Sequence, residues 1–475
     1  MQQMSPRSVI VRVMRTEVFP MSVEPVASPR EASPQRWRRP LGLAECLFWQ
    51  LDRALCGNFI AYVELTGLVV EEDLARGLAA LIEAHPILRA RIVEDAVVGR
   101  PCFEEVDAAS PTLTRVAAEP EVLLHHWLRE ADLSIDESRA PLFRAHWASD
   151  GERTWVGLTF HHAIGDGESA ARLLSEWIRF LDEGVGPRPT LPPPPQESFY
   201  RPEAFGAPDK AAHLATVVAD VRARLQGLAP GNVVPGLCER MTLTRELGHR
   251  EFGLLPEQTE ALAQACRRHG VTVHGALGAA YLGALHAEFL APGQSVVLSL
   301  ASPVNLRNAR RGRVEADDVA VRVSGVVSRI RVSDPDELWQ LADTVTRDIR
   351  QQAEVGNAHL LHELVYAQTP PSLARESGLA LLEGMRRFPW NSVLTNTGRM
   401  RILEHGRKLT VRRLGFLGAP TPSQALVMSI STCGGLQTHT VYDRQNLPPD
   451  RANSLLRRFE ERLLGAIDSR DVRAT

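Results

Sequence analysis

The strongest constraint on the fold is a strand pattern that is followed at once by a helix pattern, with a short glycine-containing loop between them. Residues 154–160 have the length and the apolar content of a half-buried strand. In residues 168–182 apolar side chains recur at steps of three and four, which predicts a helix with one buried face. Strand and helix patterns alternate along the rest of the chain as well. We therefore predict a mixed α/β fold in which helices cover sheets, rather than a bundle or a sandwich.

A proline-dense stretch at residues 187–195 predicts an extended, stiff segment and provides the best internal boundary. We place one lobe before it (residues 36–186), a linker at residues 187–210, and a second lobe after it (residues 211–475). The first 35 residues hold too short an apolar run for a signal peptide, so we expect a disordered lead-in at 1–35. Further patterns predict helices at 73–83, 256–268, 272–288 and 334–350, a strand at 295–300, and a last helix near 455–464.

Charge and composition exclude several classes of function. The formal net charge is −3 with both signs interspersed, so the chain lacks the single-sign field that nucleic acids or anionic membranes attract. No apolar run reaches the roughly 18 residues that a membrane-spanning helix needs, so we expect a soluble protein. The six cysteines form neither a C-x-x-C pair nor a zinc-site spacing, which favours reduced thiols and a cytoplasmic location.

The loop between the predicted strand and helix carries the side chains best suited to chemistry. Its sequence is His161-His162-Ala163-Ile164-Gly165-Asp166-Gly167. A loop at this place can hold a polar side chain rigidly at the mouth of a cleft, and its glycines permit the turns that aim it. Because the ordinary pKa of an imidazole is about 6.5, one of these histidines could accept a proton from a hydroxyl or an amine. Asp166 could orient the loop through an ion pair, or hold the ring through a hydrogen bond.

Two adjacent histidines are not by themselves a sign of catalysis. The second pair of the chain, His125-His126, lies inside a helical pattern, and we interpret it as ordinary surface and core histidine. His162 and Asp166 could ligate zinc, but no third His, Cys or Glu stands at a companion spacing, so we predict no metal site. A metal-dependent hydrolase built on His161, His162 and Asp166 nevertheless stays open as an alternative.

The complete pattern H-H-x-x-x-D-G resembles the signature of the superfamily that holds nonribosomal-peptide condensation domains, polyketide-associated acyltransferases and plant alcohol acyltransferases. Other segments resemble further motifs of this superfamily, in the expected order along the chain. These segments are residues 40–45, 85–89, 140–144, 270–280, 303–307, 395–399 and 441–444. The resemblance spans residues 38–467, but the D-F-G-W-G motif of the plant members is absent, which weakens the case for coenzyme A as the donor.

The resemblance implies two chloramphenicol-acetyltransferase-like lobes that form a pseudo-dimer, with the active site in a channel at their interface. It implies that His162 is the catalytic base and that the acyl donor is a phosphopantetheine thioester, borne by an acyl or peptidyl carrier protein or by coenzyme A. The acceptor would be an alcohol or an amine in polyketide or nonribosomal-peptide metabolism. No tightly bound cofactor is implied, and a monomer would suffice.

The resemblance also implies supporting residues. Asp166 would pair with an arginine of the other lobe, for which Arg307 is the candidate. His161 would support the loop, Gly167 would permit the close turn, and Asn396 would line the junction. A non-catalytic carrier-binding module of the same fold is the alternative function, and its docking patch would consist of Arg307, Arg310, Arg311 and Arg313.

Overall fold

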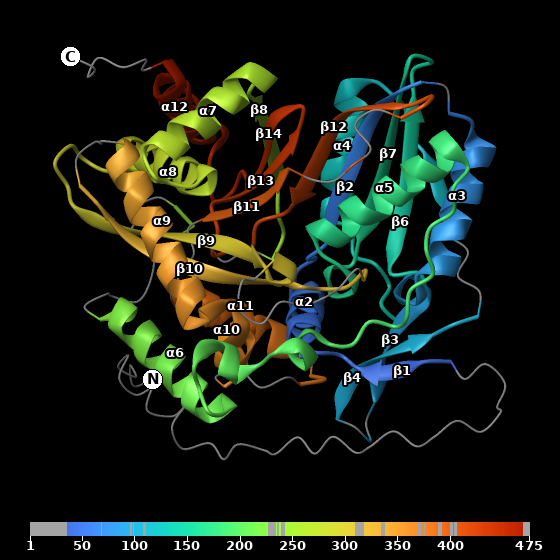
Figure 1. Ribbon diagram of the computed structural model, residues 1–475, viewed down its shortest axis with the longest axis horizontal. Helices are drawn as coiled ribbons and strands as arrows, with labels where there is room; N and C mark the ends of the chain where they lie inside the picture. Colours follow the sequence, from blue (N-terminus) through green and yellow to red (C-terminus); the bar gives the residue numbers. More distant parts are fainter. Residues whose placement is uncertain are drawn as a thin grey trace.

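The computed structural model contains two lobes that lie side by side, each built on its own sheet (Figure 1). It describes residues 36–468, except for residues 68, 96, 98, 108–110, 227–233, 235–236, 239–242, 309–317, 334–337, 368–371, 375, 388–391, 400–401 and 403–405. The predicted mixed α/β class and the two-lobe arrangement are confirmed. The lead-in at 1–35 and the arginines at 310, 311 and 313 lie outside the described residues.

The first lobe comprises two sheets and the helices that cover them. Its elements are β1 (Arg38–Pro40), α2 (Leu43–Ala54), β2 (Phe59–Thr66), α3 (Glu71–Ala84), β3 (Ala90–Asp95), β4 (Arg100–Glu105), β5 (Leu113–Arg115), α4 (Pro120–Ala131), β6 (Phe143–Ser149), β7 (Arg153–Phe160) and α5 (Gly167–Glu183). The large sheet has the strand order β12-β2-β7-β6-β5, in which β12 (Thr410–Gly418) comes from the second half of the chain, and the small one has the order β1-β4-β3. Helices α3 and α5 cover one face of the large sheet, and α4 covers the other (Figure 1).

The second lobe comprises a six-stranded sheet with the order β10-β9-β11-β13-β14-β8 and a group of helices. Its elements are β8 (Leu247–Gly253), α7 (Pro256–Arg268), α8 (Val273–Phe289), β9 (Val296–Asn305), β10 (Val323–Val332), α9 (Leu338–Val355), α10 (Asn357–Tyr366), α11 (Glu376–Arg387), β11 (Ser392–Arg399), β13 (Leu426–Cys433), β14 (Gly435–Asp443) and α12 (Pro449–Asp468). Helix α8 is apolar on every side and is buried between α7, α9 and α12.

One strand of the second half crosses to the first lobe. Strand β12 (Thr410–Gly418) pairs antiparallel with β2 at the edge of the first lobe's sheet. The Asp182 carboxylate at the end of α5 accepts the backbone N–H groups of Arg407, Lys408 and Leu409 at 2.6–2.8 Å, which anchors the start of this crossing. The predicted second lobe at 211–475 therefore includes one strand that belongs in space to the first lobe.

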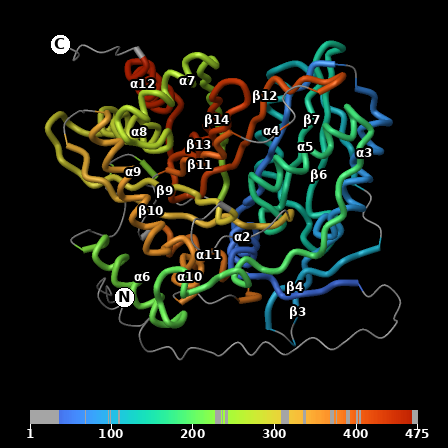
Figure 2. The backbone as a smooth tube through the Cα atoms, viewed as in Figure 1, coloured from blue at the N-terminus to red at the C-terminus, as the bar shows by residue number. Residues whose placement is uncertain are grey.

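The proline-dense stretch at 187–195 has neither helix nor strand, as predicted, but it is tied to both lobes. The Pro193 carbonyl accepts a hydrogen bond from Arg39 Nε at 2.7 Å, and the Pro194 carbonyl accepts one from Arg322 Nη2 at 2.9 Å. The chain then runs below α2 and reaches α6 (Lys210–Leu225) beside the second lobe (Figure 2). Helix α2 packs against α10 and α11, so it forms part of the junction between the lobes.

The other predicted elements lie where the periodicity placed them, within a few residues. The helix predicted at 73–83 is α3, and the helices predicted at 256–268 and 272–288 are α7 and α8. The helix predicted at 334–350 is described from Leu338 onward. None of the described helices is long and apolar enough to traverse a lipid bilayer.

Candidate active site

The candidate site is the short connection between β7 and α5, as the strand and helix patterns predicted. His161 follows the last strand residue, and His162–Ile164 form one turn of 3₁₀ helix. Asp166 is the N-cap of α5, and its Oδ1 accepts the backbone N–H of Ser169 at 2.9 Å. A strand end and a capped helix start thus fix both ends of this loop.

The His162 ring is held between two aromatic side chains. Phe48 of α2 stacks on it with a centroid distance of 3.7 Å and an interplanar angle of 3°, and Phe59 of β2 lies tilted at 4.7 Å. Burial lowers the pKa of His162 to about 4, while the backbone groups of His162 and Gly165 and the Asp166 carboxylate act in the opposite direction. The imidazole is therefore neutral at neutral pH, which is the form that can accept a proton.

Asp166 and Arg307 meet at the interface of the lobes. Arg307 Nη1 donates to Asp166 Oδ2 at 2.8 Å, and only 9% and 5% of the two side chains are exposed. The same oxygen accepts the backbone N–H of Arg322 at 2.7 Å. Burial alone would raise the pKa of Asp166, but the guanidinium of Arg307 and the N–H donors hold it below its ordinary value. The carboxylate thus links the loop to the second lobe rather than to the His162 ring.

Ser169 completes this interface cluster. Its Oγ donates to the Ala320 carbonyl at 2.8 Å and accepts from Arg307 Nη2 at 2.9 Å and from the Ala320 N–H at 3.1 Å. Arg307 Nη2 also donates to the Ala320 carbonyl at 2.9 Å. Because each buried polar group has a partner from the other lobe, the start of α5 is fixed in one position.

Gly167 lies against strand β11. A Cβ at Gly167 would lie 3.2 Å from Cγ2 of Thr397, so the small residue permits the close approach of β11 to α5. The neighbouring Asn396 accepts the backbone N–H of Gly398 with its Oδ1 at 2.8 Å, within its own strand. Its place along the junction stays a prediction.

His161 is buried behind the loop and faces a carboxylate of α2. Its Nδ1 accepts the backbone N–H of Ala163 at 3.2 Å, so its proton resides on Nε2, which lies 3.6 Å from Asp52 Oδ2. The other oxygen of Asp52 accepts the N–H of Gly57 at 2.9 Å. Burial lowers the pKa of His161, and Asp52 opposes that shift. Asp52 therefore anchors the turn after α2 and lies beside the supporting histidine, beyond hydrogen-bond distance of its ring.

We expect Asp52→Ala to lower the free energy of unfolding by about 1.5–3 kcal/mol, because it removes a charged, buried hydrogen-bond acceptor. Asp52→Asn keeps an oxygen for Gly57 and should cost less than half as much. Urea denaturation of the two variants measures the difference. Equal losses in both would show that the charge beside His161, and not the hydrogen bond to Gly57, provides the stability.

Phe48, Asp52, Phe59, Ser169 and Arg322 were not assigned to the site from the sequence. Phe48 and Asp52 are four residues apart on α2, so they lie on the same helix face and contact the two adjacent histidines. This spacing is a signal that could have been found. No local pattern points to Ser169 or Arg322, since their partners come from the opposite lobe.

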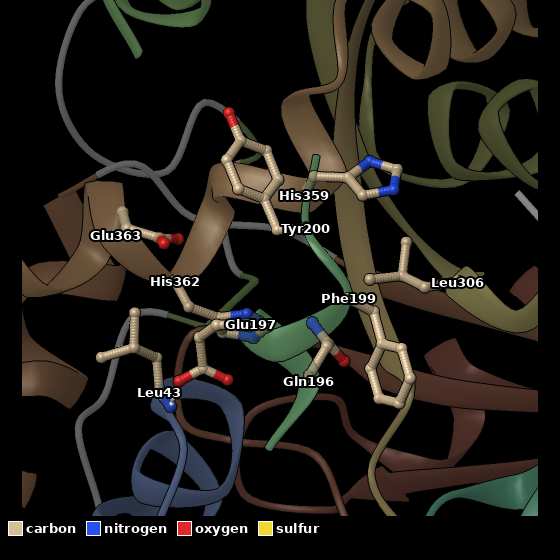
Figure 3. A pocket seen from close by; sticks show the side chains of 9 residues that line it. All are labelled: Leu43, Gln196, Glu197, Phe199, Tyr200, Leu306, His359, His362 and Glu363. Carbon is tan, nitrogen blue, oxygen red and sulfur yellow. Dashed lines mark hydrogen bonds between the residues drawn. The ribbon is translucent and has the colours of Figure 1, made fainter. Parts of the chain in front are cut away.

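A small cavity of about 20 Å³ lies at the junction between the start of α2, the linker and α10 (Figure 3). Leu43, Glu197, His359 and Glu363 are among its lining residues. A larger groove of about 380 Å³ lies between α6 and α9. Neither space is lined by His162, so the channel to this histidine stays a prediction.

The fold is similar to that of several solved structures. The chain resembles polyketide synthase associated protein 5 from Mycobacterium tuberculosis, with a TM-score of 0.63, 17% identity, and 90% of this chain and 98% of that chain covered. It also resembles the cyclization-docking bidomain of the nonribosomal peptide synthetase EpoB from Sorangium cellulosum (TM-score 0.66, 17% identity, 91% and 86% covered). The first condensation domain of the CDA synthetase matches with a TM-score of 0.66 and 18% identity, over 91% of this chain and 97% of that chain.

The second half of the chain carries a more specific match. Residues 247–432 match the family described as "Phthiocerol/phthiodiolone dimycocerosyl transferase C-terminus". Together with the fold, this match confirms the resemblance to the superfamily of condensation domains and polyketide-associated acyltransferases. None of the curated proteins matches the sequence.

Proposed function

We propose that this chain is a condensation-type acyltransferase, in which His162 removes a proton from an alcohol or an amine while that group attacks a thioester carbonyl. The observation that supports this proposal most is the neutral imidazole of His162, held by Phe48 and Phe59 at the loop between the lobes. A general base must be uncharged before the reaction, and its ring must be held in one orientation. Both conditions are met before any substrate is present.

A low pKa of His162 makes it a weaker base in the first half of the reaction but favours return of the proton in the second half. The attack forms the new ester or amide bond, and collapse of the tetrahedral species breaks the carbon–sulfur bond and releases a thiolate. The thiolate takes the proton from His162, because the ordinary pKa of a thiol, about 8.5, is far above the value of about 4 of this imidazole. The base thus returns to its neutral form without a covalent acyl-enzyme.

The donor under this proposal is an acyl phosphopantetheine on an acyl or peptidyl carrier protein, with acyl coenzyme A as the less favoured source. Several similar solved structures are domains of nonribosomal peptide synthetases, one of them a four-domain synthetase, which supports a carrier-bound donor. Since the two lobes supply both sides of the site, a single chain is sufficient, and we propose a monomer.

The direct test is a mass-spectrometric assay of the full chain with acyl groups on a carrier protein or on coenzyme A, each with a panel of alcohols and amines. We expect ester or amide products, with faster formation from the carrier-bound donors. Binding of the acylated carrier without product from any acceptor would instead support the non-catalytic carrier-binding module.

The hydrolase alternative loses support from the geometry of the loop. Asp166 directs its carboxylate to Arg307 and Arg322 of the second lobe, so it does not join His161 and His162 in a shared ligand set. A metal ion at this place would have to compete with a buried guanidinium for the same oxygen. We therefore assign Asp166 to positioning the loop.

A further inference from the structure

A second group of histidines lies on the opposite face of the first lobe's sheet, beneath α4. His126 and Glu130 are one turn apart on α4, so both point the same way, and His146 extends toward them from β6. Helix α5 covers the other face of this sheet (Figure 1), and Ala163 and Ile164 of the histidine loop pack in the same core as α5. The group is therefore separate from the candidate active site.

The hydrogen bonds of this group assign the protons. Thr159 Oγ1 donates to Glu130 Oε2 at 3.3 Å, so it accepts from His146 Nε2 at 3.0 Å. With its proton on Nε2, His146 presents the lone pair of Nδ1 to His126, whose Nε2 lies 3.0 Å away. The two imidazoles thus share a single proton between facing nitrogen atoms.

We propose that His126, Glu130 and His146 form a zinc site, with water in the fourth position. Two imidazoles and a carboxylate are a ligand set that Zn²⁺ prefers. One ligand atom from each of the three side chains lies within 4.8 Å of the other two. Zinc bonds of about 2.0–2.2 Å place neighbouring ligand atoms roughly 3.3–3.5 Å apart. Glu130 Oε2 now lies 3.4 Å from His146 Nε2, so zinc binding requires the Glu130 carboxylate to turn toward the Nδ1 side of that ring.

The surroundings of the site favour a cation that enters from one side. His146 and Glu130 are buried, whereas His126 is partly exposed, so the ion and its water reach the site along the outer edge of α4. Thr159 fixes the ring of His146 through the nitrogen that does not bind the metal, which is the outer-shell arrangement typical of zinc-binding histidines. Arg144 Nε donates to Glu130 Oε2 at 2.5 Å, so the ion shares the Glu130 carboxylate with this guanidinium.

Binding changes the tautomer of one imidazole. Zn²⁺ takes the lone pairs of His126 Nε2, His146 Nδ1 and a Glu130 oxygen, and the His126 proton moves from Nε2 to Nδ1 through solvent, so both rings stay neutral. The ion then connects α4 to β6, so its role is to stabilise the packing of this helix on the sheet. This changes the interpretation of the pair His125-His126, since only His125 is an ordinary surface residue.

The test is zinc titration of the metal-free full chain by calorimetry and thermal melting. We expect one Zn²⁺ per chain and a rise in Tm, with little net release of protons from the ligands at neutral pH, which is measured by repeating the titration in buffers of different ionisation enthalpy. His126→Ala should remove the rise in Tm and weaken binding by more than about 100-fold, beyond the 10- to 100-fold typical for loss of an outer-shell partner. Thr159→Val should weaken zinc binding by about 10- to 100-fold, the loss typical of an outer-shell partner.

His125→Ala is the matched control, because His125 is the exposed neighbour of His126 on the same helix. It should bind zinc as the unaltered chain does. The proposal is wrong if no stoichiometric zinc binds, or if His126→Ala binds zinc as tightly as His125→Ala. Either result would mean that the three side chains serve only as a buried polar network.

Discussion

Replacement of His162 by alanine is expected to lower kcat by about 10²–10⁴-fold, the usual contribution of a positioned general base. The variant loses the group that takes the proton during attack, but Phe48 and Phe59 remain to close the space around it. The measurement is product formation by mass spectrometry under the conditions of the donor and acceptor panel. Thermal melting of the same preparation shows whether the variant is folded.

Two controls make this result specific. His125→Ala removes an exposed histidine on α4 and should leave turnover unchanged. Phe48→Ala keeps the base but uncovers its ring, so the pKa of His162 should rise from about 4 toward its ordinary value of 6.5. Near-normal turnover by a folded His162→Ala variant would contradict the proposed function.

The pH profile tests the state of the same imidazole. Because His162 is neutral above its pKa, kcat/KM should fall only as the pH approaches about 4, well below the value for an exposed histidine. In Phe48→Ala, the fall of kcat/KM at acid pH should begin at a higher pH, because the pKa of His162 is raised. A fall near pH 6.5 in the unaltered chain would show that the ring is more solvated than its packing indicates.

The local unit around this histidine could be predicted because every part of it is encoded in neighbouring residues. The apolar run of β7, the glycines of the loop and the three-to-four spacing of α5 are adjacent in sequence, and each imposes its own geometry. The buried α8 could be predicted for the same reason, although its all-round apolar surface indicates burial without saying which helices cover it.

What the sequence could not predict depends on chain segments that are far apart. Strand β12 joins the first lobe through backbone pairing with β2, and backbone pairing leaves no mark on residue type. The register of β11 decides that Thr397 contacts Gly167, and a shift of one residue turns every side chain of a strand to the other face. Arg322 contributes its backbone N–H to Asp166, which any residue but proline could do.

Loss of the Asp166 carboxylate is expected to have the largest effect on stability. Asp166→Ala leaves the Arg307 guanidinium buried without its counter-charge, removes the N-cap of α5, and leaves the N–H of Arg322 without this acceptor. Breaking a buried ion pair by removal of one partner costs about 3–5 kcal/mol. Urea denaturation at pH 7 should show a loss of this size, with a corresponding fall in Tm.

The exposed pair of Arg347 and Asp343 provides the matched control. Its N–O distance is 2.7 Å, close to that of the buried pair, but 68% and 45% of the two side chains are exposed. Asp343→Ala should therefore change the free energy of unfolding by less than about 0.5 kcal/mol. The double variant Asp166→Ala, Arg307→Met should lose less than the sum of the single changes, because it leaves no charge unpaired.

The pH dependence separates the ion pair from the hydrogen bonds. The pKa of Asp166 is lower in the folded chain than its ordinary value of 3.8, so its charge contributes stability above that value and loses the contribution as the pH falls through the folded pKa. The difference in stability between the unaltered chain and Asp166→Ala should therefore narrow between pH 7 and pH 3. Asp166→Asn retains an oxygen for the N-cap but carries no charge. At pH 7 its loss in free energy of unfolding should be most of the loss seen in Asp166→Ala. A variant with asparagine that is as stable as the unaltered chain at pH 7 would show that the cap, and not the charge, joins the two lobes at this loop.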